Sequence, residues 1–256
     1  MAHICIFDSG SGGLSVYREL VRQLPRERYS YYADNAHCPY GEKSALYIRR
    51  RSRFITEFLL DQGADIIVVA CNTATAAAIA TLRAEYPEVP FIGMEPAVKP
   101  AALGTRTGVI GVLATAGTLK GSKYLNTRGR FQEDVTIVEH VGQGFVELVE
   151  NGVLDGPEAE SVVRASLQPL LDAGADTIVL GCTHYPFLQP LIERLSGPGV
   201  QVIDPAPAVA RQTVRVLEQR GIRTGEGPFS VQLYASGSRD SLDRIFSLID
   251  TPHEEA

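Results

Sequence analysis

A nine-residue segment of this 256-residue chain occurs twice, and this repeat is the strongest constraint on its fold. Residues 63–71 read Gly-Ala-Asp-Ile-Ile-Val-Val-Ala-Cys, and residues 174–182 read Gly-Ala-Asp-Thr-Ile-Val-Leu-Gly-Cys, with six identical positions. The Gly-Ala-Asp start alone is explained by a common helix-to-strand connection, because glycine often ends helices. That explanation does not account for a cysteine after the apolar run in both copies. The repeat therefore predicts a duplicated unit with a strand that ends in cysteine.

The similarity between the two halves extends beyond the repeat. Glu95-Pro96-Ala97 follows Cys71 by 24 residues, and Asp204-Pro205-Ala206 follows Cys182 by 22. The opening strand, which ends in Asp8-Ser9, has a counterpart in the strand before Ala114-Thr115. Each half thus runs strand, helix, strand ending in cysteine, helix, strand. Two similar lobes with a break near 99–107 are expected.

Short β-branched runs alternate with amphipathic segments along the whole chain. The expected strands are 4–7, 66–70, 91–93, 109–112, 136–138, 178–180, 200–203 and 230–234, and the expected helices include 14–24, 42–62, 73–85, 158–173 and 208–220. Continuously apolar strands are typical of parallel sheets with helices on both faces. The sequence predicts an α/β fold whose two lobes carry mainly parallel sheets and are related by a pseudo-two-fold axis.

Composition excludes several classes of protein. With 45% hydrophobic and 21% charged residues the chain can build a core, and a net charge of −6 argues against general nucleic-acid binding. The cluster Arg49-Arg50-Arg51 with Arg53 is expected to be a solvated helix face rather than a partner site. A strand at 4–7 leaves no room for a signal peptide, and no apolar run is long enough to span a membrane, so a cytoplasmic protein is expected. Four widely spaced cysteines without a C-x-x-C pair predict free thiols and no metal site.

The positions of Cys71 and Cys182 indicate a chemistry. Ligands of open α/β sheets bind beyond the carboxyl ends of the strands, where both cysteines are expected. A helix should begin just after each, and its positive end favours thiolate over thiol. Either cysteine alone could be an inert buried thiol. A symmetric pair instead suits inversion of a carbon centre: one thiolate removes a proton, the other thiol returns one from the opposite face, and no cofactor is required.

Two further residues are candidates to support this chemistry. Asp8 stands in the glycine-rich segment Asp8-Ser9-Gly10-Ser11-Gly12-Gly13, whose spacing differs from a dinucleotide fingerprint. It could receive a substrate ammonium, orient a catalytic group, or be a plain turn residue. His184 lies two residues after Cys182, and a Cys–His pair can move protons near neutral pH.

Several motifs resemble the glutamate racemase family of the aspartate/glutamate racemase superfamily. They are Phe7-Asp8-Ser9-Gly10 with Gly12-Gly13-Leu14-Ser15, Pro39-Tyr40-Gly41, Ala70-Cys71-Asn72-Thr73-Ala74 and Gly181-Cys182-Thr183-His184-Tyr185-Pro186. The resemblance implies a cofactor-independent isomerase that interconverts L- and D-glutamate. It also implies a supply of D-glutamate for peptidoglycan synthesis, cell wall biogenesis and cell shape, in a bacterial cytoplasmic homodimer. The lobes would comprise residues 1–98 plus 208–256, and residues 99–207, with the active site in the cleft between them.

The resemblance also assigns roles to residues. Cys71 and Cys182 would be the acid/base pair, facing the protons of D- and L-glutamate respectively, with Asp8 assisting Cys71 and His184 assisting Cys182. Glu150 would be a further assisting carboxylate, although the segment that matches the family around it is short. The implied substrate contacts are Asp8, Ser9, Tyr40, Gly41, Asn72, Thr73, Thr183 and His184.

The sequence departs from the family pattern at several positions, and other functions are compatible with it. Ser11 replaces a more usual valine, Asn35-Ala36-His37 differs from the family pattern, and the family's N-terminal extension for a precursor activator is missing, so no such activation is expected. The alternatives are a racemase of another amino acid such as aspartate, a thiol redox protein, and an interaction protein that uses the Arg49–Arg53 face. A disulfide between Cys71 and Cys182 would need Cα atoms within about 7 Å.

Overall fold

Two separate parallel sheets form the framework of the protein. The computed structural model describes residues 1–222, 224–225 and 227–249. The first sheet has the order β4-β3-β1-β2-β9, and the second has the order β6-β5-β7-β8. The strands are β1 (His3–Asp8), β2 (Arg28–Ala33), β3 (Ile66–Val69), β4 (Phe91–Gly93), β5 (Val109–Ala114), β6 (Thr136–Val141), β7 (Thr177–Gly181), β8 (Gln201–Ile203) and β9 (Ser230–Ala235). Every pairing in both sheets is parallel, as predicted.

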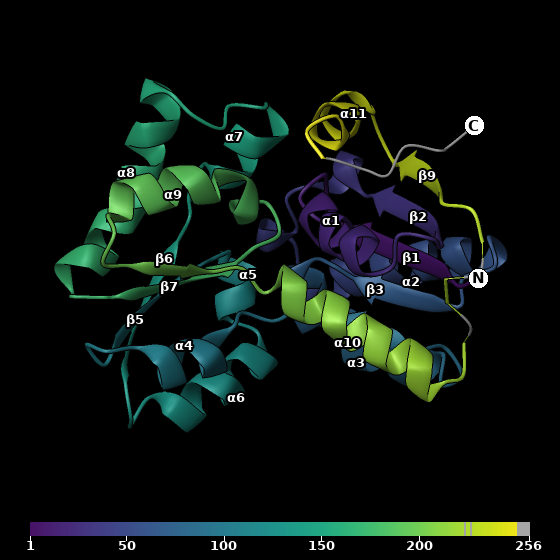
Figure 1. The fold of residues 1–256 in the computed structure, drawn as a ribbon, viewed down its shortest axis with the longest axis horizontal. Helices are drawn as coiled ribbons and strands as arrows, with labels where there is room; N and C mark the ends of the chain where they lie inside the picture. The colour runs from purple at the N-terminus through teal and green to yellow at the C-terminus, as the bar shows by residue number, and fades with distance from the viewer. Residues whose placement is uncertain (223, 226, 250–256) are drawn as a thin grey trace.

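Each sheet is covered by helices, and each sheet with its helices forms one of two lobes (Figure 1). They are α1 (Leu14–Gln23), α2 (Ala45–Asp61), α3 (Asn72–Glu85), α4 (Val98–Gly104), α5 (Ala116–Leu119), α6 (Ser122–Phe131), α7 (Phe145–Glu150), α8 (Pro157–Asp172), α9 (Gln189–Ser196), α10 (Ala206–Gln219) and α11 (Asp240–Phe246), with short 3₁₀ turns η1 (Asn35–His37), η2 (Tyr40–Glu42) and η3 (Tyr185–Leu188). Helix α10 lies against α1 of the first lobe, and α11 contacts α7 of the second. No helix among the described residues is both long and apolar enough to cross a bilayer.

The internal repeat is visible in the topology. The order β4-β3-β1-β2 in one sheet corresponds to β8-β7-β5-β6 in the other, so each cysteine-ending strand lies beside the first strand of its own lobe. The repeated glycines Gly63 and Gly174 have positive φ angles of 82° and 84°, which glycine adopts without steric cost. The repeated aspartates also act alike: Asp65 accepts a hydrogen bond from the His3 N–H, and Asp176 accepts one from the Arg106 N–H just before β5.

The burial of the central strands explains why the sequence alone predicted them. Strands β1, β3 and β7 are buried along their full length, and the apolar residues in each form a continuous run rather than an alternating pattern. Helix α1 buries Leu14, Tyr17, Leu20 and Val21 at the spacing of one helical face. Truncating one such leucine to alanine typically costs about 2–5 kcal/mol.

The eight expected strands are confirmed, and one strand was missed. The missed strand is β2, which is rich in tyrosine, and its aromatic residues Tyr29, Tyr31 and Tyr32 are buried. Aromatic residues favour strands, so this signal was present in the sequence. Helix α4 lies in the stretch where the break between the lobes is expected, and it packs against β5 and β7. Helices α5, α6, α7, α9 and α11 were also not predicted.

Candidate active site

Cys71 and Cys182 line the same pocket. Cys71 directly follows Ala70 at the end of β3, and Cys182 directly follows β7. Their exposed fractions are 5% and 6%, and all four cysteines are free thiols. The other residues of the pocket are Ser9, Pro39, Tyr40, Gly41, Asn72, Thr73, Thr115, Val146, Thr183 and His184. The two sulfur atoms thus share one cavity, which two inert thiols in separate interiors would not do.

The environment of Cys71 differs from the prediction. As expected, it stands at the N-terminus of a helix, where its Sγ accepts a hydrogen bond from the Ala74 N–H at 3.4 Å. However, burial raises the pKa of the Cys71 thiol and the nearby Asp8 carboxylate raises it further, while contacts with Ala74 and Ser9 only partly oppose them. The expectation that the helix N-terminus lowers the pKa of Cys71 is therefore wrong. Its resting form is the thiol, because desolvation outweighs the helix terminus.

The environment of Cys182 is not the mirror image of that of Cys71. No α-helix begins at Thr183, contrary to expectation; the 3₁₀ turn η3 starts at Tyr185 instead. The neighbour of Cys182 is a side chain, since His184 Nδ1 lies 3.8 Å from Cys182 Sγ. The two thiols therefore occupy equivalent strand ends with different polar partners.

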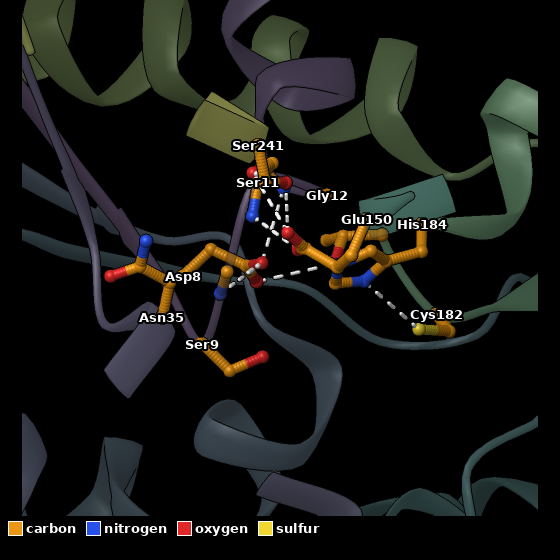
Figure 2. A network of polar contacts seen from close by, with 12 residues as sticks. Asp8, Ser9, Ser11, Gly12, Asn35, Glu150, Cys182, His184 and Ser241 are labelled. Atoms are coloured by element: carbon orange, nitrogen blue, oxygen red, sulfur yellow. Dashed lines mark hydrogen bonds and ion pairs between the residues drawn. The ribbon is translucent and has the colours of Figure 1, made fainter. Parts of the chain in front are cut away.

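A carboxylate lies behind His184. His184 Nε2 is 2.7 Å from Glu150 Oε1, at the end of α7 (Figure 2). Burial alone would lower the pKa of His184, but contacts with Cys182 and Glu150 outweigh it and hold that pKa well above 6.5. Burial likewise raises the pKa of Glu150, yet hydrogen bonds from His184 and the two serines around it lower it to about 2. The pair is thus an imidazolium and a carboxylate at neutral pH.

Two serines complete the surroundings of Glu150. The Ser11 N–H donates to Glu150 Oε1 at 2.7 Å, the Ser11 hydroxyl donates to Oε2 at 3.1 Å, and the Ser241 hydroxyl also donates to Oε2. Ser241 comes from α11, far away in sequence (Figure 2). Ser11, a departure from the family pattern, therefore contributes directly to this network. Glu150 does not line the cysteine pocket and reaches it only through His184.

Asp8 is held by the protein itself. It is fully buried, and burial raises its pKa. One carboxylate oxygen accepts from the N–H groups of Gly10 and Gly13 at 3.2 Å, and the other accepts from the Thr183 hydroxyl at 3.1 Å. Asp8 is not among the residues that line the pocket, and its hydrogen-bond partners do not include Cys71. It connects the glycine-rich turn of one lobe to the loop after Cys182 in the other.

The polar lining includes residues that are free to receive a ligand. The Asn72 side chain is 97% buried, and neither of its amide atoms has a hydrogen-bond partner among the described residues. Thr73 and Thr115 share a hydrogen bond at 2.8 Å across the two lobes. Unpaired buried polar groups are costly, so Asn72 marks a place where a polar ligand fits.

Tyr40 is anchored from behind the pocket. Its hydroxyl donates to Asp34, which is itself held by Arg51 through two hydrogen bonds at 2.7 and 2.9 Å. Arg53 similarly pairs with Glu85, and Arg49 donates to the Ala77 carbonyl, so three arginines of the basic cluster bind within the chain. These contacts favour a structural role for the cluster over a partner site.

The structure brings the predicted contacts Ser9, Tyr40, Gly41, Asn72, Thr73, Thr183 and His184 to one pocket, but not Asp8. Three lining residues were missed: Pro39, Thr115 and Val146. The sequence carried a signal for Thr115, because Thr115 follows β5, which corresponds to β1 of the first lobe. Val146 had none, because its place depends on how α7 lies against the first lobe.

Fold and site together define a two-lobed α/β protein that presents two thiols to one pocket. The model of the Asp/Glu/Hydantoin racemase family matches residues 6–213, and the chain belongs to this family. It is 49% identical to a glutamate racemase from Ectopseudomonas mendocina, over 97% of this chain and 94% of that protein. Among solved structures, a glutamate racemase isoform from Bacillus anthracis superposes with a TM-score of 0.87 at 33% identity, covering 96% and 93% of the two chains. Escherichia coli glutamate racemase, in complex with L-glutamate and the activator UDP-MurNAc-Ala, gives 0.85 at 33% identity, covering 97% and 95%. The family resemblance seen in the motifs is confirmed.

Proposed function

We propose that this chain interconverts L- and D-glutamate by proton transfer between two thiols. The observation that carries the proposal is the shared pocket of Cys71 and Cys182, which approach it from different sheets. The E. coli relative with L-glutamate bound supports glutamate as the substrate. Aspartate is the alternative substrate, and the experiment below compares the two.

The reaction needs one base and one acid on opposite faces of the α-carbon. For L-glutamate, the Cys182 thiolate takes the α-proton, and the Cys71 thiol gives its proton to the other face. The products of this step are D-glutamate, a Cys182 thiol and a Cys71 thiolate, so the proton count is conserved. The reverse reaction starts from that second state. Both proton carriers belong to the chain, so we propose no metal or organic cofactor.

The resting state of the pocket suits the L-glutamate direction. Burial and the Asp8 charge keep Cys71 as a thiol, ready to donate. His184, whose pKa is held well above 6.5, lies beside Cys182 with its Nδ1 atom 3.8 Å from the sulfur. Glu150 keeps His184 charged and fixes the direction of its ring, so Glu150 acts as a positioning residue.

The remaining pocket residues would hold the substrate. Asn72 offers an unpaired amide, and Ser9, Thr73, Thr115 and Thr183 add hydroxyl groups for the carboxylates and the ammonium. We assign Asp8 a positioning role, because it holds Thr183 and lies behind the lining.

The broader setting is also part of the proposal. Membership in the family and the similarity to glutamate racemases support a role in supplying D-glutamate for peptidoglycan, in the cytoplasm and as a homodimer. We divide the chain into lobes 1–98 plus 208–256, and 99–207. The pairing of β9 with β2 and the contact of α10 with α1 support this division, while residues 250–256 lie outside the described part.

Circular dichroism of L-glutamate incubated with the purified protein in D₂O, without additives, tests the proposal. The signal should decay to zero, and deuterium should appear at the α-carbon of the product. L-aspartate serves as the matched substrate control and should lose its signal much more slowly. A stable glutamate signal would refute the proposed activity. Faster loss of the signal with L-aspartate would show that aspartate, not glutamate, is the preferred substrate.

A further inference from the structure

Cys38 is the one thiol near the site that the proposed reaction does not use. It lies between η1 and η2 and is partly exposed. One donor atom each from Cys38, Glu150 and His184 lie within 4.8 Å of one another. These three side chains come from three separate segments, so only the tertiary structure brings them together.

A second cavity gives access to this cluster. It borders the cysteine pocket at Pro39 and Val146, and its other lining residues include Cys38, Glu150, Ser241 and Arg244. Figure 2 shows Glu150 between His184 on one side and Ser241 on the other. A small hydrated ion could therefore reach Cys38 and Glu150 without passing through the substrate pocket.

The donor set is typical of zinc. A thiolate, an imidazole nitrogen and a carboxylate bind Zn²⁺ at about 2.0–2.3 Å, which places the donors roughly 3.5 Å apart in a tetrahedral site. The Cys38 sulfur lies within 4.8 Å of both partners, and the His184–Glu150 pair, now 2.7 Å apart, would have to open to admit the ion. Ser11 and Ser241 already donate to the Glu150 carboxylate, as outer-shell partners of metal-bound carboxylates do.

We propose that Cys38 Sγ, His184 Nε2 and a Glu150 oxygen form an inhibitory site for Zn²⁺ and similar divalent transition metals. The ion would take the place of the proton that His184 and Glu150 share and would displace the Cys38 thiol proton, with a water from the second cavity as fourth ligand. Bound metal breaks the His184–Glu150 hydrogen bond and removes the imidazolium from beside Cys182. The inhibition rests on the proposed racemase function, whereas metal binding does not.

Metal binding is tested on the whole chain with Co²⁺ as the spectroscopic probe and Zn²⁺ as the competitor. Wild type should show a thiolate-to-cobalt charge-transfer band, which Cys38→Ser should lose while binding Zn²⁺ at least about tenfold more weakly. Cys71→Ser and Cys5→Ala should keep the band. Cys5→Ala is the matched control, because Cys5 also lies beside a histidine, His3, at 3.4 Å. A band that survives in Cys38→Ser and disappears in Cys71→Ser or Cys182→Ser would place the metal on the reactive thiols and overturn the proposal.

Inhibition is measured separately. Zn²⁺ should stop racemisation by wild type, whereas Cys38→Ser should keep the basal rate and require at least about tenfold more Zn²⁺ for the same loss. Equal sensitivity of both proteins would overturn the inhibitory role. If the chain racemised neither amino acid, the cobalt spectra would still decide whether the site exists.

Discussion

Glu150 Oε1 lies 2.7 Å from His184 Nε2, on the opposite side of the imidazole from Cys182. The Glu150 carboxylate, the His184 imidazole and the Cys182 thiol thus follow one another, and Cys182 lines the pocket. Cys71 stands at the equivalent strand end, and its hydrogen-bond partners among the described residues are the Ala74 N–H and the Ser9 hydroxyl. The duplication therefore places the two thiols at equivalent strand ends, but of the two only Cys182 has the His184–Glu150 pair beside it.

Replacing Glu150 with glutamine should change the pH profile of the reaction. The neutral amide removes the charge that offsets the burial of His184, so the pKa of His184 should fall and the imidazolium should be lost at lower pH. The alkaline limb of kcat/KM should move to lower pH, with a loss of roughly 10- to 100-fold, below the ~10²–10⁴ typical of a group that transfers the proton itself. Glu147→Gln, on the exposed side of the same helix, is the control. An unchanged profile in Glu150→Gln would contradict the relay.

Replacing either pocket cysteine with alanine should remove the proton acceptor or the proton donor. Racemisation should fall by at least about 10²–10⁴-fold in both Cys71→Ala and Cys182→Ala, as the loss of a general acid or base does. Because the two enantiomers have equal free energy, kcat/KM must fall equally in both directions, which circular dichroism can check from either side. Cys5→Ala, in the core of β1, should stay active. Appreciable racemisation by either pocket variant would exclude a two-thiol mechanism.

Asn72→Ala should separate substrate binding from folding. The Asn72 amide has no hydrogen-bond partner among the described residues, so the folded protein loses no internal hydrogen bond, and the free energy of unfolding should change by less than about 1 kcal/mol. Loss of a hydrogen bond to a charged substrate is worth about 1.5–3 kcal/mol, which predicts a roughly 10- to 100-fold lower kcat/KM. Ser52→Ala is the matched control, because the Ser52 hydroxyl is also buried and unpaired but lies in α2, away from the pocket. A strong loss of stability without a change in kcat/KM would show that Asn72 is structural.

Gly12→Ala should misplace His184. A Cβ atom at Gly12 would lie 2.4 Å from His184 Nδ1, so the imidazole must move away from Cys182. Small misplacements of catalytic groups can cost up to about 100-fold, and we expect a loss of roughly 10- to 100-fold in kcat/KM. Gly104→Ala, at the end of α4 with no atom within 4 Å of the added Cβ, should leave the rate unchanged. Equal rates for the two variants would argue against a role for the His184 position.

Local patterns in the sequence were sufficient for the framework of the fold. The strands that end at Cys71 and Cys182 are continuously apolar because they are buried on both faces, and the repeated Gly63 and Gly174 mark the same helix-to-strand turn. These features depend on the chain near each residue, so a single sequence displays them. The aromatic strand β2 was missed, although its composition carried a usable signal.

Effects that come from distant segments could not be predicted from the sequence. The helix start at Cys71 predicted a thiolate, but burial and the charge of Asp8 keep it a thiol, and desolvation cannot be read from neighbouring residues. Ser241 and Cys38 meet at Glu150 although long stretches of chain separate all three. Local sequence determined the strands and the two cysteines, whereas the packing of the lobes decided which groups face each thiol, because burial and charge act through space rather than along the chain.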